Sequence, residues 1–123
     1  MQPFVVALPD GVLEQWHALG SRLNAMAHIM NAHDKLPPSE LSGLLAQLRA
    51  LFKRSFGVLR DADPVPAYTL APAVRHHLRK VGVNLAQIRK RFDQLGLEAP
   101  IILVRLLQRI RTLMNGEQPP HGS

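Results

Sequence analysis

An internal repeat constrains this chain more than any other feature of its sequence. When the sequence is shifted by 62 residues, an ungapped match pairs Gly20 with Gly82 and Pro38 with Pro100. Apolar residues of helices align by chance more easily than glycine and proline do, so we interpret the match as a duplication. A length of 123 residues suits one compact domain. We expect a single domain over 1–123, with a first repeat at 1–61, a second repeat at 62–114 and a disordered tail at 115–123.

Each repeat is predicted to form a helical hairpin. In the first repeat, apolar residues recur every three or four positions over residues 10–32. After a break that contains two prolines, Ser39 is suited to cap a second helix, which we expect to end near Ser55. The second repeat carries the same two stripes, with Gly96 suited to end its first helix and Pro100 suited to the first turn of its second helix.

Two glycines lie in the middle of the long apolar stripes. Gly20 and Gly82 each cost about 1 kcal/mol relative to alanine in a helix, so some feature of the fold should compensate. We interpret them as sites where two unbroken helices approach each other at a pseudo-twofold crossing. The alternative is that each glycine forms a turn that divides its segment into two shorter helices.

A short extended stretch precedes each hairpin, at residues 4–8 and 66–70. The sequence leaves open whether these stretches pair or serve only as linkers. Neither hairpin can bury its apolar stripe alone, so we predict a mainly α fold in which two pseudo-repeated hairpins form a four-helix arrangement. The alternative, which follows if Gly20 and Gly82 are turns, is a fused pseudo-dimeric ribbon-helix-helix fold.

Basic residues are concentrated in the second half of the chain. The net charge is +6, and division after Asp61 gives six basic against five acidic residues, then nine against four, or +1 and +5. Arginines four positions apart repel each other on a helix, and folding supplies no evident reason for the pairs 75/79 and 105/109. Phosphate contacts would supply one, because Arg and Lys bind phosphate oxygens and release counterions. The predicted DNA-binding residues are Arg75, Arg79, Lys80, Arg89, Lys90, Arg91, Arg105 and Arg109.

Residues 79–88 carry a motif that reads Arg-Lys-Val-Gly-Val-Asn-Leu-Ala-Gln-Ile. It resembles the Asn-Leu-Asn-Gln-Ile-Ala core, with its basic and apolar lead, of bacterial plasmid mobilisation proteins of the MobC type. The first repeat is similar to other parts of that pattern, at Leu23, Asn24 and Asn31 and in the leucine-rich segment 44–51. The resemblance implies a relaxosome accessory protein that binds DNA at a transfer origin, assists a relaxase and does not itself cut DNA.

The two repeats differ in surface chemistry although they share one core pattern. Where the second repeat has Arg75 and Arg91, the first has Leu13 and Ile29, which lie off the main apolar stripe. We therefore expect the second hairpin to meet DNA and the first to meet a protein. The alternative is that Leu13 and Ile29 pack beneath the extended stretches. The predicted protein-binding residues are Leu13, Ile29, Asn84 and Gln87.

No catalytic, metal-binding or membrane pattern stands out. The chain has no cysteine, and its six histidines lack the spacing of a metal site. The single tyrosine, Tyr68, has no clustered ligands that would mark it as a nucleophile. Neither an apolar run of about 18 residues nor a signal-peptide pattern is present, so we expect a cytoplasmic protein without a membrane partner. We predict that it is not an enzyme and that it needs no cofactor or metal.

These patterns together predict a helical, DNA-binding accessory protein of plasmid mobilisation and conjugation. Its partners would be the double-stranded DNA of a transfer origin, contacted at phosphates, and a relaxase. The alternative is a protein-binding helical adaptor, or an antitoxin-like regulator, whose basic face meets an acidic partner. The sequence leaves the oligomeric state open.

Overall fold

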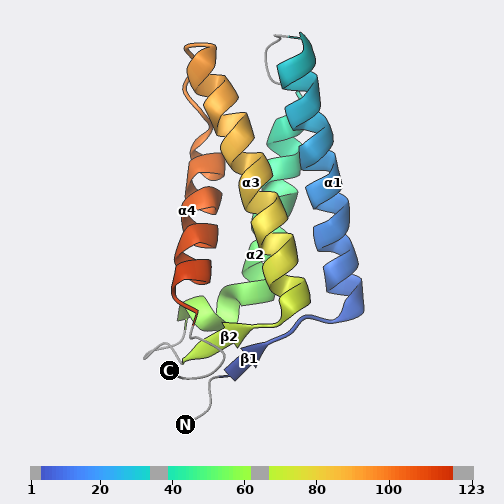
Figure 1. The fold of residues 1–123 in the computed structure, drawn as a ribbon, viewed down its shortest axis with the longest axis vertical. Coiled ribbons are helices and arrows are strands. Elements are labelled where there is room, and N and C mark those ends of the chain that lie inside the picture. The colour runs from blue at the N-terminus through green and yellow to red at the C-terminus, as the bar shows by residue number, and fades with distance from the viewer. Residues whose placement is uncertain (1–3, 34–38, 62–66, 118–123) are drawn as a thin grey trace.

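Four helices and a two-stranded sheet make up the described part of the chain (Figure 1). The computed structural model describes residues 4–33, 39–61 and 67–117. The predicted mainly α, four-helix arrangement is confirmed. In chain order the elements are β1 (Phe4–Val6), α1 (Asp10–His33), α2 (Glu40–Asp61), β2 (Tyr68–Leu70), α3 (Pro72–Gln94) and α4 (Ile101–Asn115).

The two hairpins lie side by side and run in the same direction. β1 pairs in parallel with β2, with Phe4 opposite Tyr68 and Val6 opposite Leu70. α1 packs against α3 and α2 against α4, and the two helices of each pair point the same way (Figure 1). The extended stretches are therefore paired strands rather than linkers. Neighbouring units of stacked repeat proteins lie against each other in this manner.

Both long helices run unbroken through their central glycines. Gly20 lies between α1 and α3, where an added Cβ would be 3.6 Å from Cγ2 of Val81. Gly82 faces a different helix, because its added Cβ would be 3.4 Å from Cγ2 of Ile110 on α4. The ribbon-helix-helix alternative, which needs turns at both glycines, is therefore wrong. The expected pseudo-twofold crossing is also wrong, since it would place both glycines between α1 and α3.

The apolar stripes of the four helices face one continuous core. Aromatic rings of α1 and α2 cluster within it. Trp16 is 1% exposed, and its ring centroid lies 6.3 Å from that of Phe52 and 5.9 Å from that of Phe56. The indole N–H of Trp16 donates a hydrogen bond to Oγ of Ser55 at 3.0 Å, so its buried polar atom is satisfied.

α2 is longer than the sequence predicts. The helix was expected to end near Ser55 but continues to Asp61. Phe56 and Leu59 extend its apolar stripe and are both buried. Burial of these two side chains outweighs the modest cost of Gly57 within the helix.

The turn between α3 and α4 follows the predicted stop signal. Gly96 has a φ of +70°, a left-handed conformation that glycine adopts without strain. The N–H of Leu97 donates to the carbonyl of Phe92 at 2.9 Å, and the N–H of Gly96 donates to that of Asp93 at 3.1 Å. These two bonds define a Schellman motif. Pro100 lies directly before α4, one residue earlier than expected.

Hydrogen bonds link the C-terminal end of α4 and the residues after it to β2. The hydroxyl of Tyr68 donates a hydrogen bond to the carbonyl of Leu113 at 2.5 Å. The carboxylate of Glu117 accepts hydrogen bonds from the Leu70 N–H at 2.6 Å and from Oγ1 of Thr69 at 3.1 Å. Residues 115–117 of the predicted disordered tail are thus placed in the structure, and residues 118–123 lie outside the described residues.

Candidate anion-binding groove

The predicted DNA-binding residues do not share one surface. On α3, Arg79 and Lys90 are exposed and lie three helical turns apart on its outer face. Lys80 and Arg89 are half-buried. The Cδ atom of Lys80 would be 3.9 Å from a Cβ added at Gly20, so the stem of this side chain packs between α1 and α3.

Two of the predicted arginines form contacts within the protein. Nη2 of Arg75 lies 2.7 Å from the carboxylate of Glu117 and also donates to the carbonyl of Leu70 at 3.2 Å. Nε of Arg91 donates to the carbonyl of Met30 at 3.2 Å, which links α3 to α1. The argument that folding supplies no reason for Arg75 is therefore wrong. Its partner lies 42 residues away in the sequence, beyond the reach of helical spacing rules.

Arg75 and Glu117 together bind the outward-facing peptide groups of Leu70, on the outer edge of β2. The Ala71 N–H donates to the carbonyl of Val6 on β1, so the peptide groups of Leu70 point to the opposite side. There the Leu70 N–H is bound by Glu117 and its carbonyl by Arg75. Burial alone would raise the pKa of Glu117, but hydrogen bonds from Arg75, Leu70 and Thr69 outweigh it and lower the pKa below its ordinary value.

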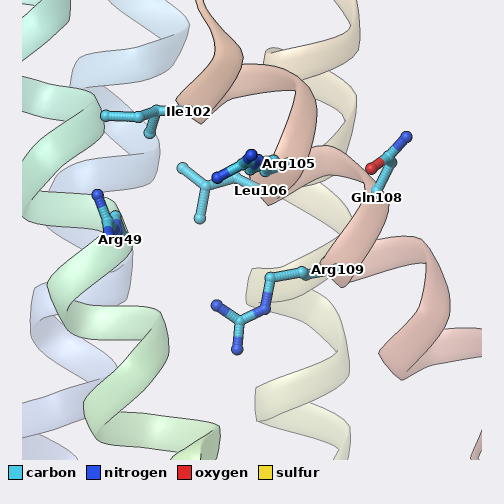
Figure 2. Close-up of a pocket in the computed structure, with 6 residues that line it drawn as sticks. All are labelled: Arg49, Ile102, Arg105, Leu106, Gln108 and Arg109. Atoms are coloured by element: carbon cyan, nitrogen blue, oxygen red, sulfur yellow. The ribbon is translucent and has the colours of Figure 1, made fainter. Parts of the chain in front are cut away.

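The remaining two predicted residues, Arg105 and Arg109, meet Arg49 in a groove between α2 and α4. Figure 2 shows Arg105 and Arg109 reaching from α4 toward α2, with Arg49 on the facing helix. Because Arg105 and Arg109 are four residues apart, they project from the same side of α4. The groove has a volume of about 470 Å³ and is lined by Arg49, Ile102, Arg105, Leu106, Gln108 and Arg109.

The groove is strongly positive. Within the described residues, neither Arg49 nor Arg105 forms a hydrogen bond or an ion pair. The guanidinium carbon of Arg109 lies 4.8 Å from the ring centroid of Phe52, in a cation–π contact that fixes its position. Three guanidinium groups in one groove repel each other, so an anion that joins them would bind favourably.

A second, apolar compartment adjoins the arginines along the same seam. It has a volume of about 410 Å³ and shares Gln108 and Arg109 with the first compartment. Aromatic and aliphatic side chains form most of its wall. The full set of lining residues is Phe52, Phe56, Leu59, Tyr68, Gln108, Arg109, Thr112 and Leu113.

Sequence reasoning missed Arg49 as a site residue. The duplication pairs it with Arg111, and it follows a residue of the apolar stripe, Leu48. These signals place Arg49 beside the core of α2. They do not reveal which helix α2 faces across that flank, and the groove exists only because α4 lies there.

The four predicted protein-binding residues do not share one environment. Ile29 is 44% exposed and Gln87 is exposed, so both are accessible. Leu13 is half-buried and packs against the core, whereas the exposure of Ile29 contradicts the alternative in which both residues pack beneath the extended stretches. Asn84 is 5% exposed, and its Nδ2 donates to the carbonyl of Gly20 at 3.4 Å. The prediction that Asn84 contacts a partner is therefore wrong, because this side chain is enclosed between α1 and α3.

Three histidines gather where α1 meets the start of α3. The ring of His77 lies 6.2 Å from that of His17 and 5.5 Å from that of His76, measured between centroids. Burial, followed by repulsion from His76, His17 and Lys80, lowers the pKa of His77. Among the described residues, no three His, Asp or Glu side chains are grouped in a way that could hold a metal ion.

Comparison with known proteins gives no match. No family model, curated protein or solved structure matches this chain. None of the helices within 4–33, 39–61 and 67–117 combines the length and the apolar character that a membrane crossing requires.

Proposed function

We propose that this protein is a DNA-binding accessory protein that contacts phosphates through the groove between α2 and α4. The observation that carries the proposal is the convergence of Arg49, Arg105 and Arg109 from two helices on one groove. Guanidinium groups match phosphate oxygens in geometry as well as in charge, since each can donate two parallel hydrogen bonds. Helices also hold the three groups more firmly than loops would.

The charge around the groove supports a polyanionic ligand. The net charge of the chain is +6, and a charge of this sign attracts DNA over distances of about 10 Å. Arg79 and Lys90 are exposed on α3 and add to the positive potential. Contacts of this kind position DNA without reading its sequence.

The chain's resemblance to MobC-type proteins supports a role in plasmid mobilisation. On that basis the protein would act in the cytoplasm, at a transfer origin, beside a relaxase. Ile29 and Gln87 are accessible and remain candidates for the protein contact.

We also propose that the protein is not an enzyme. A DNA-cleaving role would require a tyrosine nucleophile or a metal cluster. The single tyrosine, Tyr68, is 6% exposed, and its hydroxyl is bound to the carbonyl of Leu113. Burial and the nearby Glu117 raise the pKa of Tyr68, which disfavours the phenolate that a nucleophile needs.

DNA binding can be tested by fluorescence anisotropy with a labelled duplex of about 20 base pairs over about 50 to 200 mM salt. The double variant Arg49→Gln/Arg105→Gln is expected to bind roughly tenfold more weakly. The slope of log affinity against log salt should flatten by about 2, because about 0.9 is lost for each phosphate contact.

A charge-matched control separates the groove from net charge. Arg22 and Arg54 are exposed on the α1–α2 side, where they bond to Gln47 and Gln15. Arg22→Gln/Arg54→Gln removes the same two charges and should change the affinity far less. An equal loss in both double variants would contradict the assignment to the groove.

A second candidate function is a protein-binding adaptor with an acidic partner. The apolar compartment beside the arginines favours it, because carboxylates pair with guanidinium groups as phosphates do. Absence of duplex binding at about 50 mM salt would contradict the DNA proposal and leave this function in its place.

A further inference from the structure

We propose that the groove between α2 and α4 holds one unpaired nucleotide of a DNA strand, with its phosphate among the arginines and its base in the apolar compartment. This inference rests on the proposed DNA-binding function and names the form of DNA that the site would prefer. The two compartments share lining residues and differ in chemistry, one being lined by arginines and the other mostly by apolar side chains.

The two compartments adjoin each other closely enough for a single nucleotide. Both are lined by Gln108 and Arg109, so one begins where the other ends. Arg49 and Arg105 line only the first compartment, which holds the arginines. Phe56 lines only the second, apolar compartment. A nucleotide has two parts of the same kind, because one sugar joins its charged phosphate to a flat base whose faces pack against apolar groups. Phosphate and base could therefore occupy the two compartments at once.

A paired duplex could use only half of this site. Its phosphates are accessible, but its bases are stacked and paired in the interior. The arginines would then be occupied, and an apolar compartment of about 410 Å³ would stay empty beside them. Proteins that accept unpaired or extruded bases place them against aromatic and apolar side chains, next to contacts with the backbone.

The walls of the apolar compartment suit a base. Three of its lining residues, Phe52, Phe56 and Tyr68, carry aromatic rings, and Leu113 adds aliphatic surface. Thr112 is exposed and lines the same compartment, so a hydroxyl lies near its edge. A base that enters would exchange water for apolar contact and keep its polar edge near the surface.

The experiment compares three labelled DNAs that differ at one position. The first is a perfect duplex, and the second carries one additional, unpaired adenine nucleotide. The third carries an abasic residue at the same place, which keeps the additional sugar and phosphate but lacks the base. We expect the unpaired adenine to strengthen binding about tenfold over the perfect duplex, and the abasic form to recover little of this gain.

A matched pair of variants assigns the preference to the compartment. Thr112→Phe places a bulky ring at the edge of the compartment from an exposed position and should reduce the preference for the unpaired adenine to less than about threefold. Ile101→Phe adds the same ring at a position that is 65% exposed and outside both compartments, so it should keep the preference. Circular dichroism spectra of both variants should match that of the wild-type protein.

The outcomes separate this inference from the proposed function. Equal affinity for all three DNAs would overturn the inference and leave phosphate binding intact. Absence of binding to any of them would overturn both. Deoxyadenosine 5′-monophosphate serves as a competitor that distinguishes the two sources of a nucleotide. If it displaces the DNA with the unpaired adenine at a concentration similar to that of the DNA itself, the site binds free nucleotides. The inference that the site holds a nucleotide of a DNA strand is then overturned.

Discussion

The α1–α3 pair and the α2–α4 pair each join a helix of the first hairpin to the corresponding helix of the second, but one pair is closed and the other is open. Between α1 and α3, Gly20 contributes no side chain, and Asn84 donates a hydrogen bond to its carbonyl. Between α2 and α4, the long side chains of Arg49, Arg105 and Arg109 line a groove. The two helix pairs therefore differ in role: α1–α3 stabilises the bundle, whereas α2–α4 presents charge.

The difference shows that a shared core pattern does not fix what happens at its flanks. Leu48 and its counterpart Ile110 are both buried. Beside them, Arg49 of α2 faces the groove, whereas Arg109 reaches it from the opposite helix. A small residue beside the core lets two helices approach, and a long charged residue keeps a space that a ligand can fill.

The largest expected effect comes from forcing the closed pair apart. Gly20→Leu should lower the free energy of unfolding by about 2 to 3 kcal/mol, because α3 leaves no room for an additional side chain. Gly20→Ala should cost much less, since its Cβ would lie at an ordinary contact distance of 3.6 Å from Val81. Urea unfolding followed by circular dichroism measures both changes.

The control for this prediction is Gly43→Leu on α2. No heavy atom lies within 4 Å of a Cβ at Gly43, so this change should be neutral or stabilising. If Gly20→Leu and Gly43→Leu had equal effects, the α1–α3 pair could not be closed in the way described.

An intermediate effect on stability is expected from a change at Glu117, which links the segment after α4 to β2 and α3. Glu117→Ala leaves the Leu70 N–H and the Arg75 guanidinium without this partner, and it should cost about 2 kcal/mol in the free energy of unfolding. Thermal unfolding near neutral pH measures the change. A variant as stable as the wild-type protein would show that the open pair does not depend on this contact.

The same contact predicts a pH dependence. Hydrogen bonding holds the pKa of Glu117 in the folded protein below the ordinary value of 4.5. Its carboxylate therefore stabilises the fold fully above pH 4.5 and progressively less as the pH falls through the lower folded-state pKa. The stability difference between the wild-type protein and Glu117→Gln should be constant near neutral pH and shrink in acid. A difference that grows in acid would contradict the assigned direction.

The smallest expected effect on stability comes from the open pair itself. Arg49→Gln/Arg105→Gln should change the free energy of unfolding by less than about 0.5 kcal/mol, because neither arginine has a hydrogen-bond or ion-pair partner in the described structure. Urea unfolding of this variant, beside its DNA affinity, tests whether the groove serves binding rather than folding. A loss of more than about 2 kcal/mol would assign the arginines a structural role.

Helical spacing was sufficient to predict that the chain forms four helices. The stripes defined four helices and most of their core, because burial repeats with the period of the helix. Gly96 marked the end of α3 correctly, since its conformation depends on neighbouring residues only. The end of α2 was misplaced at Ser55 because Gly57 carries a local signal that the burial of Phe56 and Leu59 overrides.

The partners of the helices could not be predicted in the same way. Arg75 was predicted to bind DNA because its ion-pair partner, Glu117, lies far along the chain in a segment that was predicted to be disordered. Asn84 was placed on the surface because spacing alone did not reveal that α1 covers this flank of α3. Arg49 was missed for the same reason. Which flank becomes a contact depends on how the two hairpins are placed side by side.

The cover over the outer edge of β2 has a consequence for self-association. A strand from another molecule that approached this edge would need the peptide groups of Leu70, which already bond to Glu117 and Arg75. It would have to displace the Arg75–Glu117 ion pair before it could bond to Leu70. At Leu70, the outer edge of β2 is therefore protected against strand addition by Arg75 and Glu117, the ion pair that also ties the segment after α4 to the sheet.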